Sequence, residues 1–110
     1  MNDPNDFKNI TVAQYQTQFF ETVPHTLLDV RTVAEFVQGR IPSALNIPLD
    51  ELPERLSEIP NHLPIIVVCA HGVRSIYGSQ YIRHAGFEDV YNLEGGTVAW
   101  WQHRLPLERP

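Results

Sequence analysis

The single cysteine of the chain, Cys69, stands where a run of β-branched residues gives way to a short loop with a glycine. The stretch reads VVCAHGVRS over residues 67–75, and a segment of helical character follows it. Inward-facing loop amides and the positive end of a following helix both favour an anion, so they lower the pKa of a thiol and make it nucleophilic. The stretch therefore predicts thiolate chemistry at Cys69.

Two further residues of the loop narrow that chemistry. Gly72 is free to take a positive φ and to turn successive N–H groups inward, and Arg74 offers a planar cation suited to an oxyanion. A thiolate in such a ring can attack either phosphorus or sulfur. Four residues separate Cys69 from Arg74, one fewer than in the loop of cysteine-dependent phosphatases. The smaller ring favours a single sulfur atom over a tetrahedral phosphate.

The elements that must position this loop alternate along the chain. Apolar segments predict strands over 7–10, 26–30, 44–49, 64–70 and 89–95, and helices are predicted between and after them over 11–21, 32–39, 50–59, 75–86 and 96–104. The order predicts an α/β fold with a mainly parallel central sheet, flanked by helices on both faces. We expect the strand 64–70 to be central, because its β-branched run needs burial on both sides. Ligands bind beyond the carboxyl ends of such strands, where Cys69 stands.

Composition sets the class of the protein. The chain has 110 residues, 43% of them hydrophobic and 19% charged, with a net charge of −5. These values predict one globular domain over residues 7–110, preceded by a flexible tail at residues 1–6. The absence of a basic cluster argues against binding to nucleic acid or to anionic membranes, and no apolar run reaches the roughly 20 residues of a membrane helix. With a polar, acidic start and one cysteine, we expect a cytoplasmic monomer without a disulfide.

Three segments carry a resemblance to a known family. CAHGVRS (69–75) resembles the active-site loop of the rhodanese family of sulfurtransferases. LLDVRTVAEFVQGRIPSALNIPL (27–49) and LEGGTVAWWQHRLPL (93–107) are similar to two further segments of that family, in the same order and spacing. Two positions depart from the pattern. Arg40 stands where the family usually has histidine and Ser43 where it usually has glycine, which affects local turn geometry more than chemistry.

The resemblance implies a small rhodanese-like domain and a two-step reaction. The Cys69 thiolate takes a sulfane sulfur from a donor such as thiosulfate and becomes a persulfide, and an acceptor such as cyanide or a thiol then removes the sulfur. No metal or organic cofactor is needed. The loop would bind the transferred sulfur and the donor through Ala70, His71, Gly72, Val73, Arg74 and Ser75.

Each of these residues also has a simpler interpretation. Cys69 could be an inert core residue, although its place before the loop argues against this. Arg74 could form a salt bridge that holds the loop rather than contact the donor. His71 could act as a base, but a residue at a loop apex more often faces solvent. The scattered histidines and the lack of a second cysteine predict no metal site.

The charged residues of the first segment are interpreted as structural support. The spacing of Arg31 and Glu35 predicts an ion pair on one helix face, and Asp29 is expected to hold the neighbouring loop by hydrogen bonds. Asn46 is expected to fix backbone at a strand end. Trp100 and Trp101 are adjacent on a predicted helix, so we expect one to pack inward and the other to lie at the surface.

Three other functions stay open. The chain could be a component of a persulfide relay, in which a partner protein donates or accepts the sulfur. It could be a rhodanese-like module that binds a partner without catalysis, or a small phosphatase. The physiological donor and acceptor are not specified by the sequence.

Overall fold

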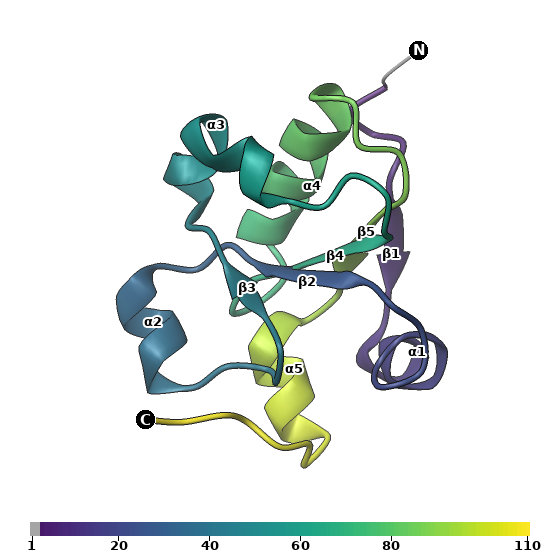
Figure 1. Cartoon of the computed structure of the whole chain (residues 1–110). Helices are drawn as coiled ribbons and strands as arrows, with labels where there is room; N and C mark the ends of the chain where they lie inside the picture. The colour runs from purple at the N-terminus through teal and green to yellow at the C-terminus, as the bar shows by residue number, and fades with distance from the viewer. Residues whose placement is uncertain (1–2) are drawn as a thin grey trace.

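Five parallel strands form the sheet in the computed structural model, which describes residues 3–110 (Figure 1). Their spatial order is β1-β5-β4-β2-β3, and every neighbouring pair is parallel. The predicted α/β class and the central place of the fourth strand are therefore confirmed. The strands are β1 (Lys8–Ile10), β2 (Thr26–Asp29), β3 (Leu45–Asn46), β4 (Ile65–Val68) and β5 (Val90–Leu93).

The β-branched run of β4 divides the core into two halves. Ile66 and Val68 pack into one hydrophobic cluster, whereas Ile65 and Val67 pack into the other. All four residues are at most 1% exposed. This is the burial expected of a central strand covered on both faces, since successive side chains point to opposite sides.

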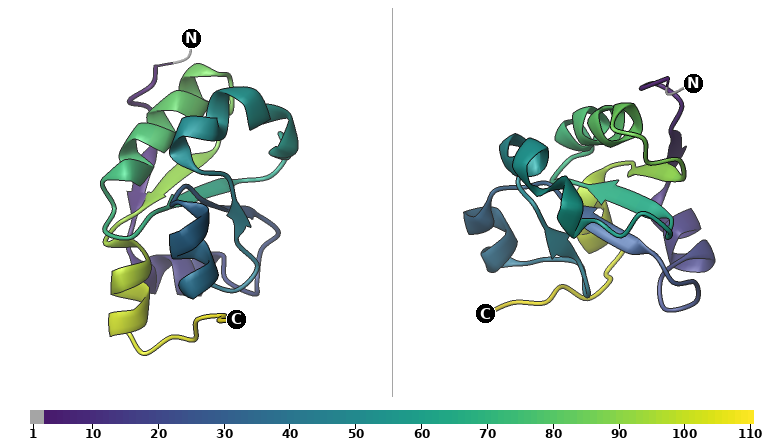
Figure 2. Two further views of the ribbon diagram at one scale, coloured as in Figure 1. Left: turned by 90° about the vertical axis from the view of Figure 1, so that its left-hand side faces the viewer. Right: turned by 45° about the horizontal axis from the view of Figure 1, so that its top comes forward.

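Helices cover both faces of the sheet, as predicted (Figure 2). On one face α1 (Val12–Gln18) contributes Tyr15 and α5 (Gly96–Gln102) contributes Trp100. On the other face lie α3 (Leu52–Arg55) and α4 (Arg74–His84). The short helix α2 (Val33–Gln38) buries none of its residues and lies beyond the carboxyl ends of the strands. None of the described helices combines the length and apolar character needed to cross a bilayer.

Two predicted helices differ from the structure by more than two residues at an end. The first ends at Gln18 rather than at residue 21, where the backbone of Glu21 has a positive φ of 59°. The segment 50–59 is a series of three short turns, η1 (Leu49–Glu51), α3 and η2 (Leu56–Glu58). Pro53 lacks an N–H group and is tolerated only in a first turn, so the α-helical part begins beside it.

The amino-terminal segment contacts α4. Of the predicted flexible tail 1–6, residues 1 and 2 lie outside the described residues. Asn5 accepts a hydrogen bond from the Gln80 side chain at 3.0 Å, and Asp6 lies 3.4 Å from the Arg83 guanidinium. Both partners belong to α4, so residues 3–6 run alongside that helix.

Candidate active site

Cys69 lies directly after β4, with its sulfur at the base of a loop that leads into α4. The Sγ atom accepts hydrogen bonds from the backbone N–H of Gly72 at 3.1 Å and of Ser75 at 3.3 Å. It also lies 3.4 Å from the Ser75 hydroxyl oxygen. Cys69 is 1% exposed. Buried and surrounded by donors, this sulfur is placed to hold a negative charge.

Opposing effects set the acidity of the thiol. Burial raises the pKa of Cys69, but its hydrogen bond with the Ser75 side chain and those from the N–H groups of Ser75, Gly72 and His71 outweigh burial. The pKa of Cys69 therefore lies below its ordinary value. A larger share of the sulfur is then thiolate near neutral pH, which is the nucleophilic form.

The start of α5 holds the loop from behind. The N–H of Thr97 donates to the Cys69 carbonyl at 2.9 Å, and the N–H of Val98 donates to the Ala70 carbonyl at 3.0 Å. This close approach needs Gly96, because an added Cβ would overlap both carbonyl oxygens. No local sequence signal indicates that α5 supports the loop, because the contact joins residues 69–70 to residues 97–98.

Arg74 is held by a residue of α2 rather than left free. Its guanidinium donates to both carboxylate oxygens of Glu35, at 2.7 and 2.8 Å. This bidentate contact lowers the pKa of Glu35 to about 2, against partial burial and with help from the Thr32 backbone and hydroxyl. The salt-bridge interpretation of Arg74 is therefore confirmed.

The predicted pair of Arg31 with Glu35 is wrong. Arg31 instead pairs with Asp29 at 2.8 Å, and both side chains are buried. The reason is that α2 begins after its N-cap, Thr32, so Arg31 precedes the helix and does not share a helical face with Glu35. Asp29 does hold the neighbouring loop, since its Oδ1 accepts from the Arg31 N–H at 3.0 Å.

Other residues near the site take the expected structural places. The Asn46 amide donates to the carbonyls of Asp29 at 2.9 Å and Arg31 at 3.0 Å, so it fixes backbone as predicted. Trp100 is fully buried and Trp101 is 59% exposed. Ser43 has a φ of 71°, a conformation that glycine adopts more easily.

Arg40 and His71 both lie away from the sulfur. Arg40 forms an isolated antiparallel bridge with Glu108, and its guanidinium stacks over the Phe36 ring at 5.0 Å. His71 is exposed at the loop apex. Among residues 3–110, its ring makes no hydrogen bond to Cys69, and only its backbone N–H acts on the sulfur.

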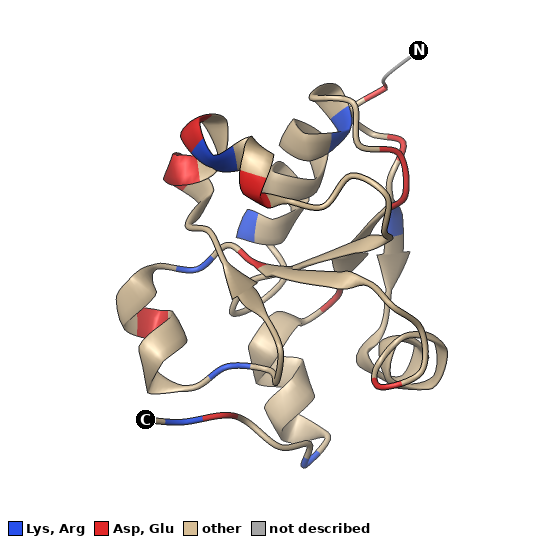
Figure 3. Ribbon diagram, viewed as in Figure 1, with Lys and Arg blue, Asp and Glu red and all other residues tan. Residues whose placement is uncertain are grey.

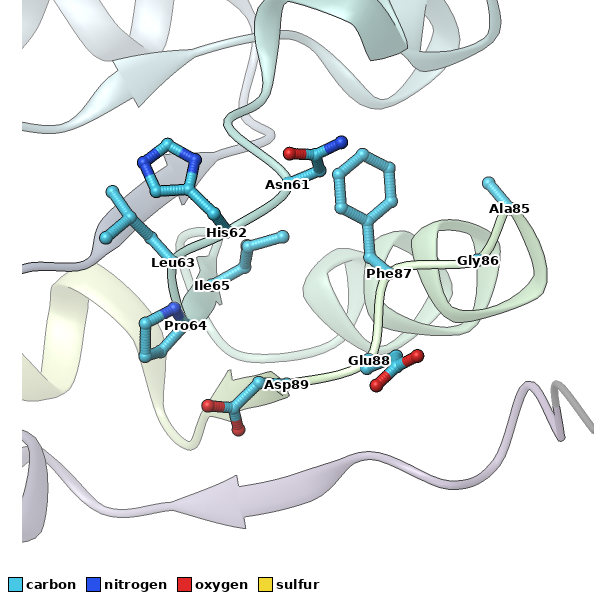
Figure 4. A pocket seen from close by; sticks show the side chains of 10 residues that line it. All are labelled: Asn61, His62, Leu63, Pro64, Ile65, Ala85, Gly86, Phe87, Glu88 and Asp89. Carbon is cyan, nitrogen blue, oxygen red and sulfur yellow. The ribbon is translucent and has the colours of Figure 1, made fainter.

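A groove of about 280 Å³ adjoins the loop between α2 and α5. Its walls include Ala70, Val98, Trp101 and Leu107, with Arg109 at the rim. The larger hollow, about 530 Å³, lies at the opposite edge of the sheet between the segment before β4 and the end of α4 (Figure 4). Its lining contains no cysteine, serine or threonine, whereas the thiol of Cys69 is surrounded by hydrogen-bond donors, so we place the candidate site at Cys69. No group of three or more His, Cys, Asp or Glu residues in the described part of the chain is suited to a metal ion.

Known proteins share this sequence and fold. Residues 11–103 match the rhodanese-like domain family. A sulfurtransferase from Allochromatium vinosum is 43% identical over 84 residues, which cover 76% of this chain and 78% of the relative. The thiosulfate sulfurtransferase GlpE of Shewanella oneidensis is 34% identical over 87% of this chain and 94% of its own length. The crystal structure of a rhodanese-like domain protein from Staphylococcus aureus superimposes with a TM-score of 0.83 at 36% identity, over 94% of this chain and 99% of that one.

Proposed function

This chain belongs to the rhodanese-like domain family, and we propose that it is a sulfurtransferase that carries sulfur as a persulfide on Cys69. The observation that carries the proposal is the convergence of the Gly72 and Ser75 N–H groups on the Cys69 sulfur. These donors favour the thiolate and are close enough to stabilise the persulfide that replaces it. The sulfurtransferases among its relatives support the same activity.

The proposed reaction has two balanced steps. In the first, the thiolate of Cys69 attacks the outer sulfur of thiosulfate, the S–S bond of thiosulfate breaks, and sulfite leaves with the electron pair. In the second, cyanide or a thiolate attacks the outer sulfur of the persulfide and releases the Cys69 thiolate. Neither step consumes a proton or an electron, so the described residues suffice without a cofactor.

The phosphatase alternative is less well supported by the same geometry. The N–H groups of the loop approach Sγ itself at 3.1 and 3.3 Å. A phosphatase loop must instead surround the three oxygens of a phosphoryl group outside the sulfur. Turnover of a generic aryl phosphate by the wild type but not by Cys69→Ser would revive it.

A second candidate function, the persulfide relay, is favoured by the surface around the loop. Exposed apolar side chains lie on each element that borders it, namely Val33 and Val37 on α2, Val73 in the loop, Tyr77 on α4 and Trp101 on α5. Among the acidic residues, Glu35 on α2 is paired with Arg74, and several others lie farther away on η1, α3 and η2 (Figure 3). The face therefore suits a protein segment whose cysteine is flanked by apolar and acidic residues, as a donor or acceptor of sulfur.

The test of the main proposal is the intact mass of the protein after incubation with thiosulfate. We expect wild type to gain one sulfur atom, Cys69→Ser to gain none, and cyanide or dithiothreitol to remove the adduct. A folded, reduced wild type that forms no adduct would refute thiosulfate as a donor. Sulfur gain from a cysteine persulfide peptide alone would then favour the relay.

A further inference from the structure

A line of polar side chains leads from the Cys69 sulfur to the far edge of the sheet. Cys69 Sγ lies 3.4 Å from Ser75 Oγ, the Ser75 hydroxyl donates to Asn92 Oδ1 at 2.5 Å, and Asn92 Nδ2 donates to Asn9 Oδ1 at 3.0 Å. Ser75 is fully buried and Asn92 is 2% exposed, whereas Asn9 is exposed. Asn9 and Asn92 are register partners on β1 and β5, so their side chains leave the same face of the sheet.

All the hydrogen bonds of this line point away from the sulfur. The thiol donates to Ser75 Oγ, the hydroxyl donates to Asn92, and the Asn92 amide donates to Asn9. This direction suits a neutral thiol only, because a thiolate or persulfide anion has no hydrogen to give. The single hydroxyl hydrogen of Ser75 cannot serve both the anion and Asn92.

Formation of the sulfur anion would therefore leave Asn92 without a hydrogen-bond donor. If the Ser75 hydroxyl turns toward the sulfur, Asn92 Oδ1 loses the one hydrogen bond that it accepts among the described residues. A buried oxygen without a donor is strongly unfavourable. A rotation of the carboxamide by about 180° restores the hydrogen bond, because its oxygen and its NH₂ group are nearly equal in size and opposite in hydrogen-bonding character.

We propose that Asn92 is a positioning residue whose amide reverses when Cys69 changes from thiol to anion. In the reversed state Asn92 Nδ2 donates to Ser75 Oγ, the Ser75 hydroxyl donates to the sulfur, and Asn92 Oδ1 accepts from Asn9. Asn9 is exposed to water and turns freely to present its own NH₂ group. The inference rests on the proposed function, in that the sulfur anion is the reacting form.

The charged groups around the sulfur do not interfere with this line. They are Arg74 with its partner Glu35, and the buried pair of Asp29 with Arg31. In the described residues, none of these four side chains hydrogen-bonds to the side chain of Ser75 or Asn92. The side chains contributed by β5 and β1 to the line are uncharged amides.

The test is the rate of alkylation of Cys69 by iodoacetamide as a function of pH. Asn92→Asp replaces the amide by a carboxylate that only accepts hydrogen bonds, so it holds the Ser75 hydroxyl away from the sulfur. We expect the apparent pKa of Cys69 to rise by about one unit, which is roughly tenfold slower alkylation below that pKa. In a Ser75→Ala background the same change should produce less than half of this shift. An equal shift in both backgrounds would overturn the proposal.

A surface variant keeps the test valid if the buried carboxylate prevents folding. Asn9→Asp lies at the exposed end of the line and locks the Asn92 amide in the thiol direction, so it should also raise the apparent pKa of Cys69. Asn9→Ala, where water replaces the side chain, should not. Asn5→Asp is the matched control, with the same charge change off the line, and should leave the profile unchanged. Equal profiles for Asn9→Asp and Asn5→Asp would contradict the reversal.

Alkylation needs no sulfur donor, so this result is separable from the proposed function. Absence of a thiosulfate adduct in a wild type with the expected alkylation profiles would refute the donor and leave the role of Asn92 intact. If wild type forms the thiosulfate adduct but neither Asn92→Asp nor Asn9→Asp shifts the pH profile of alkylation, only the role of Asn92 is refuted.

Discussion

Arg74 and Glu35, 39 residues apart in the chain, form a two-point contact at 2.7 and 2.8 Å that joins the cysteine loop to α2. The same carboxylate accepts from the Thr32 N–H at 3.1 Å and thereby completes the cap of α2. Glu35 thus fixes two things at once, the start of a helix and the orientation of the cation beside the sulfur.

Replacement of Glu35 should make the free energy of unfolding less dependent on pH in the acidic range. The pKa of Glu35 is lowered from 4.5 to about 2 by Arg74, so its stabilising effect is complete above pH 4.5 and is lost as the pH falls toward 2. After allowance for the solvent exposure of the pair, Glu35→Gln should cost about 1 kcal/mol at pH 7. The difference from wild type should shrink between pH 4.5 and pH 3 in urea unfolding.

The control for this prediction is Glu54→Gln, since Glu54 forms no ion pair among the described residues. It should leave the free energy of unfolding within error of wild type at both pH values. A constant difference between Glu35→Gln and wild type across this pH range would contradict the assignment of the effect to the carboxylate charge.

Loss of Asp29 should be costly for stability. Asp29→Asn removes the charge that neutralises Arg31, which is only 6% exposed and also donates to the Gly39 carbonyl at 2.8 Å. A buried cation without its partner typically costs about 3–5 kcal/mol. Urea unfolding measures the loss, and a change below about 1 kcal/mol would show that the pair is not desolvated as the structure indicates.

Replacement by alanine should destabilise the protein at Gly96 but not at Gly39. At Gly96, φ is 62° and a Cβ would overlap the carbonyl oxygens of Cys69 and Ala70, so Gly96→Ala should cost about 3 kcal/mol and slow sulfur loading. At Gly39 the backbone is extended and the nearest atom to a Cβ is 3.7 Å away. Gly39→Ala should therefore unfold and load like wild type. Equal stabilities of the two variants would refute the close approach of α5 to the loop.

Replacement of Trp101 should distinguish sulfur exchange with a protein partner from sulfur transfer between small substrates. Trp101→Ala should slow sulfur exchange between Cys69 and a cysteine peptide with apolar and acidic neighbours by about tenfold, the effect of losing one aromatic contact residue. Turnover of thiosulfate and cyanide should be unchanged. The matched control is Val23→Ala, because Val23 is an exposed apolar residue in the turn between α1 and β2. Equal losses with the peptide and with small substrates would count against a docking role.

The local pattern was enough to predict the elements and the place of the sulfur. The β-branched run 65–68 required a central strand, and in a parallel sheet the residue after such a strand lies at the carboxyl edge. Thr11 caps the start of α1 and Gly39 caps the end of α2, as the sequence predicts. These features depend on near neighbours in the chain, which is why they can be read from it.

The ion-pair partners of the charged side chains could not be predicted from the local sequence. Arg31, Glu35 and Arg74 allow several pairings, and the choice depends on where α2 begins and how α2 meets the loop. The i, i+4 rule applied to Arg31 assumed a helix that includes Arg31, which lies two residues before the observed start of α2 at Val33. Likewise Asn9 and Asn92, 83 residues apart, become neighbours only through the pairing of β1 with β5.

The pairing of β1 with β5 sets the order in which the site is completed during synthesis. The ribosome delivers Cys69 and its loop before residues 90–93 exist, and β1 has no neighbour in the sheet until those residues arrive. Ser75 therefore meets Asn92 only once β5 has paired with β4, and Asn92 meets Asn9 once β1 has joined β5. In the newly made chain Cys69 and the N–H groups of Gly72 and Ser75 that donate to its sulfur therefore precede Asn92, the acceptor of the Ser75 hydroxyl.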